Sequence, residues 1–226
     1  MTTEPGATAP RDPRAGPVVV AWLRAWASSV HDQRTWLTDL DAAIGDGDHG
    51  INLDRGLVAV AADLDGGMLP QDDAGAVLAA GGRRLMGVVG GASGALYGRA
   101  LVRAGAAVTK DPDFGRLPLV ALDAAVGSIV DLGHAVPGDK TMLDALIPAL
   151  DVLRAASPGE PAGTTLQRAA AAADTGAQGT IPLVARKGRA SYLGERSAGH
   201  LDPGAASSAM LVRCLAQAFA EAIDRA

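Results

Sequence analysis

The chain has 226 residues, of which 48% are apolar but only 3% are aromatic, and its formal net charge is −5. A core so poor in aromatic residues relies on Ala, Leu and Val, which favours close-packed helices over a β-sandwich. The negative charge argues against a nucleic-acid-binding protein, because such a protein needs a clustered basic face.

No segment has the pattern of a membrane or secreted protein. The apolar runs are too short to cross a bilayer, and the N-terminus lacks the basic-then-apolar order of a signal peptide. The single cysteine, Cys214, cannot form an internal disulfide, which fits a reducing compartment. We therefore expect a cytoplasmic protein with no membrane partner.

Apolar residues recur at helical spacing along most of the chain. Residues 1–17 contain four prolines and predict a disordered tail, followed by one helical domain over residues 18–226. Eight helices are expected, over residues 18–41, 51–64, 73–88, 93–108, 118–133, 139–156, 164–183 and 204–226. No strand pattern lasts beyond four residues. The short connections predict an all-α, antiparallel up-and-down bundle or barrel.

The loops after the first, third, fifth and seventh expected helices carry most of the glycines and charges that suggest chemistry. In an antiparallel bundle these loops all emerge at the same end. The arrangement predicts that four segments distant in sequence form one site there.

The first of these loops is strongly acidic. Asp41, Asp46 and Asp48 fall within eight positions of the stretch DAAIGDGDHGINLDRG, with glycines between them. Carboxylates this dense repel one another unless a cation lies between them, and an oxygen-only set favours Mg²⁺. Zinc is disfavoured, since the four histidines are scattered and one cysteine cannot make a thiolate site. The alternative is a solvated acidic turn, with Asp48 or His49 as the N-cap of the next helix.

The second and third loops offer groups for an anion. Residues 90–94 (GGASG) place N–H groups and the Ser93 hydroxyl at a helix N-terminus, although a glycine hinge explains them equally well. Residues 133–141 (GHAVPGDKT) resemble a phosphate-binding P-loop, but a helix precedes them where a P-loop requires a strand. We reject the P-loop fold, and the alternative for this loop is an Asp139 N-cap with a solvated Lys140.

The fourth loop, residues 185–204, is the most basic segment, with Arg186, Lys187, Arg189 and Arg196. An irregular connection of this length inside a compact domain is usually functional or disordered. An acidic loop and a basic loop at one end predict a nucleotide site, in which about two divalent cations balance the charge.

At these four loops the chain resembles the nucleotide-binding L subunit, or L domain, of dihydroxyacetone kinases. The matching stretches are DAAIGDGDHGINLDRG, GGASGALYG, PGDKTMLDAL and ARKGRASYLGERSAGHLDPGA. The resemblance implies an eight-helix barrel that holds ADP or ATP through two Mg²⁺ at one end. It implies that Asp41, Asp46 and Asp48 are the metal ligands. It also implies a set of nucleotide contacts: His49, Gly50, Ile51, Asn52, Ala92, Ser93, Gly133, Thr141, Arg189, Asp202, Pro203 and Gly204.

The implied reaction is phosphoryl transfer from the nucleotide to dihydroxyacetone held on a separate K subunit, with Arg189 as the catalytic residue that neutralises the transferring group. Either a phosphohistidine-carrying M subunit phosphorylates the bound ADP to ATP, with phosphoenolpyruvate as the ultimate donor, or the bound nucleotide exchanges freely with ATP in solution. A kinase for another small ketose such as erythrulose is an alternative substrate assignment. A non-catalytic, nucleotide-sensing regulator of a partner protein is the alternative from a different functional class.

Overall fold

The computed structural model describes residues 11–157 and 159–224, and within them every regular element is helical. The α-helices are α1 (Ala15–Asp32), α2 (Arg34–Ile44), α3 (His49–Asp65), α4 (Ala74–Val88), α5 (Gly91–Lys110), α6 (Leu117–Gly133), α7 (Leu143–Arg154), α8 (Ala162–Gly179) and α9 (Pro203–Asp224). Two 3₁₀ segments, η1 (Phe114–Arg116) and η2 (Arg189–Ser197), lie between them. The all-α prediction is confirmed.

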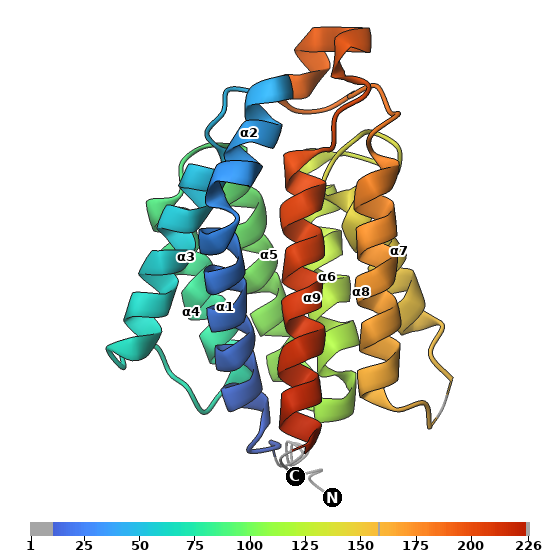
Figure 1. Cartoon of the computed structure of the whole chain (residues 1–226). Coiled ribbons are helices and arrows are strands. Elements are labelled where there is room, and N and C mark those ends of the chain that lie inside the picture. Colours follow the sequence, from blue (N-terminus) through green and yellow to red (C-terminus); the bar gives the residue numbers. More distant parts are fainter. Residues whose placement is uncertain (1–10, 158, 225–226) are drawn as a thin grey trace, which may run out of the picture.

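Eight of these helices form a closed ring. From α3 to α9 each helix packs against the next one in sequence, while α1 packs against both α3 and α9 (Figure 1). A hydrogen bond reinforces the junction of α1 and α9, because Trp22 Nε1 donates to the carbonyl oxygen of Leu211 at 2.9 Å. The up-and-down barrel is therefore closed by the contact between its first and last helices. None of the described helices is long and apolar enough to span a bilayer.

The first expected helix is in fact two helices, α1 and α2, which break at Gln33. The backbone of Gln33 (φ −103°, ψ 11°) departs from helical geometry. The buried carboxylate of Asp54 on α3 lies beside this break, 2.9 Å from His31 Nδ1 and 3.3 Å from Arg34 Nη1. Periodicity alone did not reveal the break, because apolar residues continue at helical spacing on both sides. The consequence is that α2 is a separate helix that extends above the ring (Figure 1). Asp41 lies in the last turn of α2.

The first helix begins earlier in the chain than expected. Helix α1 begins at Ala15, three residues before the expected position, and the Asp12 carboxylate accepts a hydrogen bond from Arg14 N at 2.8 Å. Helix α1 therefore includes residues 15–17, which the prediction assigned to the tail. The rest of that prediction, residues 1–10, lies outside the described residues.

Close backbone contact replaces large side chains in part of the barrel. Gly82 on α4 and Gly98 on α5 face each other, and a methyl group at Gly98 would lie 2.8 Å from the carbonyl oxygen of Gly82. Ala, Leu and Val fill most of the core, as the composition predicts, and Trp26 is the largest fully buried side chain.

The connections 45–48, 89–90, 134–142 and 180–202 lie at the same end of the barrel, where α2 and the orange segment with η2 stand above the ring (Figure 1). These are the loops that follow the first, third, fifth and seventh expected helices. The up-and-down topology thus brings the four segments together.

Candidate functional site

A cavity of about 370 Å³ opens among these four loops. Each loop contributes to its lining. The sequence-predicted residues that line it are Asp41, Asp46, Asp48, His49, Ala92, Ser93, Gly133, Thr141, Arg189, Asp202, Pro203 and Gly204. Residues up to 163 positions apart in sequence therefore form one pocket.

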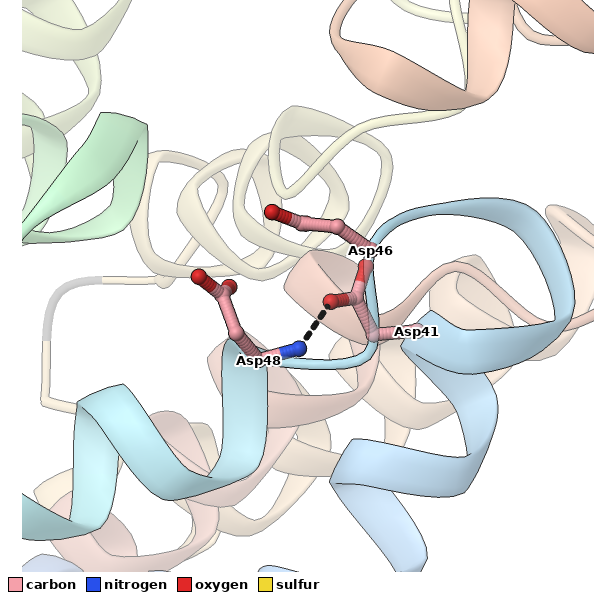
Figure 2. Close-up of side chains that lie close together, drawn as sticks. All are labelled: Asp41, Asp46 and Asp48. Atoms are coloured by element: carbon pink, nitrogen blue, oxygen red, sulfur yellow. Dashed lines mark hydrogen bonds between the residues drawn. The ribbon is translucent and has the colours of Figure 1, made fainter.

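Three carboxylates form the acidic side of the cavity. One oxygen each from Asp41, Asp46 and Asp48 lies within 4.8 Å of the others, beside the turn between α2 and α3 (Figure 2). The Asp41 carboxylate also orders this turn, because its Oδ2 accepts hydrogen bonds from Asp48 N at 2.8 Å and His49 N at 3.1 Å. Asp41 therefore satisfies backbone donors at the start of α3, whereas the Asp48 side chain makes no cap bond.

The donor set of this cluster fits a hard divalent cation. All three ligands are carboxylate oxygens, the type that Mg²⁺ prefers. Arg189 Nη1 lies 3.1 Å from Asp46 Oδ2, although the Arg189 side chain is 70% exposed. A single exposed guanidinium leaves two of the three negative charges unbalanced, so the cluster retains the capacity to hold a cation.

His49 connects the cavity to a buried polar network. Its Nδ1 lies 3.0 Å from Ser93 Oγ and its Nε2 lies 2.9 Å from Ser207 Oγ, which in turn lies 2.7 Å from the Tyr97 hydroxyl. Burial lowers the pKa of His49, while the charges of Asp41 and Asp48 raise it. A neutral imidazole has one donor and one acceptor, so both of its ring nitrogens are satisfied, and α3, α5 and α9 are linked beneath the cavity.

Asp202 directly precedes helix α9 and caps its N-terminus. Its Oδ2 accepts a hydrogen bond from Ala205 N at 2.7 Å, as expected of an N-cap residue. Burial raises the pKa of Asp202 to about 7, helped by the negative charges of Asp144 and Asp41, while the Ala205 N–H and Lys140 act in the opposite direction. Asp202 is thus a carboxyl group that changes charge near neutral pH.

The 134–142 loop differs from the alternative that the sequence left open. Asp139 accepts from Val136 N at 2.9 Å, inside the loop, and does not cap a helix. Asp144, in the first turn of α7, instead holds the loop by accepting from Gly138 N at 2.5 Å and Thr141 N at 2.7 Å. Lys140 is not solvated: it is 1% exposed and lines the cavity.

Three of the residues assigned by resemblance do not line the cavity. Gly50 is buried against α2, where a methyl group would collide with the carbonyl oxygen of Arg34 and approach Thr38 Oγ1 to 2.6 Å. Ile51 is 51% exposed and lies on a separate outer groove between α2 and α3. The Asn52 side chain accepts a hydrogen bond from Arg55 at 2.8 Å. These residues follow the acidic loop in sequence, but the helical turn directs them away from the pocket.

Sequence reasoning missed the apolar wall of the cavity. Its members are Ile44, Leu96, Tyr97, Ile129, Met142 and Leu143. Each belongs to an apolar helical pattern, and that pattern does not distinguish a residue at the pocket end from one deeper in the core. An apolar wall facing a polar, acidic side is typical of small-molecule sites.

Fold and cavity together define an all-α protein with an acidic pocket at the loop end of a helical barrel. Residues 43–217 match the sequence profile of the DAK2 domain. The chain therefore belongs to the DAK2-domain family, and the resemblance based on the four loops is confirmed.

Two relatives of similar length and one longer relative support this membership. The chain is 40% identical over 203 residues to the ADP-binding subunit of PEP-dependent dihydroxyacetone kinase 2 of Listeria innocua, covering 89% of this chain and 94% of that protein. It is also 40% identical to the ADP-binding subunit of the PEP-dependent dihydroxyacetone kinase of Escherichia coli, covering 90% and 97% of the two chains. L-erythrulose 1-kinase of Mycolicibacterium smegmatis is 38% identical, and there the match covers 88% of this chain and 35% of the longer protein.

Two crystal structures of the dihydroxyacetone kinase of C. freundii share the fold. The native form superposes with a TM-score of 0.72 at 30% identity, covering 96% of this chain. The complex with AMP-PNP and Mg²⁺ gives a TM-score of 0.71 at 31% identity. The chain spans 37% and 36% of the length of those solved chains.

Proposed function

We propose that this protein is the ADP- and ATP-binding subunit of a dihydroxyacetone kinase, a phosphotransferase. The observation that carries the proposal is the single cavity in which the acidic cluster, Arg189 and the start of α5 meet. The names of the relatives at 40% identity support the nucleotide and the substrate. The crystal structure of the C. freundii kinase with AMP-PNP and Mg²⁺ supports a metal-dependent site in this fold.

Asp41, Asp46 and Asp48 are the proposed metal ligands. One oxygen from each residue lies within 4.8 Å of the others, close enough for the three carboxylates to hold cations together. We propose two ions because three carboxylates and a nucleotide together carry more negative charge than one divalent cation can balance. Bound Mg²⁺ supplies positive charge to phosphate oxygens, and the protein supplies the ligands that place it.

The other residues bind and orient the nucleotide. The N–H groups at the start of α5, with Ser93, offer donors to phosphate, and the helix dipole favours an anion there. The apolar wall fits the base, whose faces have no hydrogen-bonding groups. Arg189, on the opposite loop, is the proposed catalytic residue, because a guanidinium beside the acidic cluster can neutralise charge on a transferring phosphoryl group.

The acceptor hydroxyl is supplied by a partner in this proposal. Phosphoryl transfer needs positioning and charge stabilisation more than a covalent intermediate, and both of His49's ring nitrogens face serine hydroxyls. We therefore assign dihydroxyacetone to a K subunit and rephosphorylation of bound ADP to a phosphoenolpyruvate-linked M subunit. The similarity to L-erythrulose 1-kinase favours erythrulose as the second candidate substrate.

Calorimetric titration of the purified protein with ADP, with and without Mg²⁺, tests the proposal. We expect binding that requires Mg²⁺ and that Asp46→Asn weakens by about a hundredfold or more, since a metal ligand is lost. The matched control is Asp39→Asn, which removes an exposed carboxylate from the same helix as Asp41 and should bind normally. Equal Mg²⁺-dependent affinity in the wild type and Asp46→Asn would contradict the metal assignment. ADP retained through purification would support the phosphoenolpyruvate-linked mode.

A further inference from the structure

Lys140 is in an unfavourable position for a lysine. The residue is 1% exposed, although burial of an ammonium group is costly unless the charge is hydrogen-bonded. Its backbone is also left-handed, with φ of +63°, which costs an L-residue about 1–2 kcal/mol. Contacts of this side chain must offset both costs, so the contacts indicate what the residue does.

The Lys140 ammonium bonds to the two ends of one long segment. Nζ donates to the carbonyl oxygen of Thr180 at 2.6 Å and to that of His200. These residues lie where the 180–202 segment leaves α8 and where it returns to α9. Two more hydrogen bonds join these two ends of the segment, which together form its base. Gly199 N donates to Ile181 O at 2.7 Å, and Asp202 N donates to Thr180 Oγ1 at 3.0 Å.

The chemistry of the ammonium favours an internal role. It has three donors, and two of them reach backbone carbonyls rather than the cavity. Burial lowers the pKa of Lys140, while the charges of Asp202 and Asp144 raise it and so favour the cation. Lys140 therefore provides a charged hydrogen-bonding centre where the 134–142 loop meets the 180–202 segment.

The segment that Lys140 closes carries one side of the cavity. Lys187, Gly188 and Arg189 line the pocket from it, and Arg189 reaches Asp46. The middle of the segment makes one small apolar cluster with α2, formed by Ile44, Ala185, Ala190 and Leu193. Its backbone is also bonded to the 134–142 loop, because Arg186 N donates to the carbonyl oxygen of Asp139, next to Lys140, at 3.1 Å. With so small an apolar contact, the position of Arg189 depends strongly on how the base of the segment is held.

We propose that Lys140 is a positioning residue, whose ammonium joins the two ends of the 180–202 segment and thereby holds Arg189 beside the acidic cluster. The effect on turnover rests on the proposed function. The effect on the segment does not, so the two parts are tested by separate measurements.

The first measurement is hydrogen exchange on the ligand-free, full-length protein. Lys140→Met removes the ammonium but keeps most of the side-chain volume. We expect amides of residues 181–202 to exchange at least about tenfold faster, which corresponds to about 1.4 kcal/mol of lost local stability, with the barrel helices unchanged. The control is Lys110→Met, since Lys110 is exposed at the far end of α5. If Lys140→Met does not fold, the milder Lys140→Gln is expected to give the same local loss at smaller amplitude.

The second measurement is a double-mutant cycle on turnover with the dihydroxyacetone-binding partner subunit. Lys140→Met should lower turnover by about tenfold or more in the wild-type background, but by less than about twofold in the Arg189→Ala background. A purely structural defect would lower turnover equally in both backgrounds.

The outcomes separate the two proposals. Unchanged exchange over residues 181–202 in Lys140→Met and Lys140→Gln overturns the positioning role, and if Mg²⁺–ADP affinity falls at the same time, Lys140 contacts the nucleotide directly. Equal losses of turnover in both backgrounds also overturn it. If the wild-type protein binds no ADP, the proposed function fails, while the exchange result still decides whether Lys140 holds the segment.

Discussion

Replacement of Asp202 by Asn should change how stability depends on pH. The carboxyl is buried and its pKa is raised to about 7, whereas in the unfolded chain it is about 3.9. Between these two values the folded state binds more protons at this group than the unfolded state does. Its contribution is therefore fully present below about pH 4 and is lost as the pH rises through about 7. The amide introduced by Asp202→Asn has no such titration, and its oxygen can still accept from Ala205 N.

The two pKa values give the size of the effect. Integrated between about pH 5 and pH 7.5, they predict that the wild type loses about 2–3 kcal/mol relative to Asp202→Asn. His49 acts in the opposite direction, since burial lowers its pKa and its protonation at low pH destabilises the fold. His49 is present in both proteins, so its contribution cancels in the difference.

Urea unfolding followed by circular dichroism, in metal-free buffer across this pH range, measures the difference directly. The free energy of unfolding of Asp202→Asn minus that of the wild type should increase steadily with pH. A difference that stays constant to within about 0.5 kcal/mol, several times smaller than the calculated change, would refute the reasoning. In that case Asp202 would be ionised throughout the range, with more hydration or stronger compensation by Lys140 than its burial indicates.

Three further predictions concern the site and its support. Arg189→Ala should lower turnover by about a hundredfold while weakening ADP binding much less; equal losses in steady-state kinetics and calorimetry would make Arg189 a ground-state contact. Gly50→Ala should destabilise the fold by about 1–3 kcal/mol, because the added methyl group meets the Arg34 carbonyl oxygen. Gly127→Ala on α6 has open space around it and should stabilise by about 0.5–1 kcal/mol; thermal unfolding that ranks these two variants in the reverse order would contradict the packing argument.

Local sequence determined the four loops and the helices, apart from the break at Gln33. Helix formation follows from apolar spacing and from glycines and prolines, all of which act over a few residues. The acidic cluster was also readable, since Asp41, Asp46 and Asp48 are close in sequence and brought together by a short turn. The topology then required the loops to share one end, because connected antiparallel helices alternate in direction. For these features the sequence was sufficient.

Only the tertiary structure decided the features that depend on packing between distant segments. Lys140 has the sequence surroundings of a solvated residue, but its partners lie 40 and 60 positions away, and their carbonyl oxygens make burial favourable. Ile51 lies only three residues after Asp48 in the acidic loop, yet the orientation of α3 turns it outward. The break between α1 and α2 likewise became visible only beside Asp54 on α3. The closed barrel sets the direction and burial of each side chain. A local sequence pattern contains no information about which distant residues the barrel places beside that side chain.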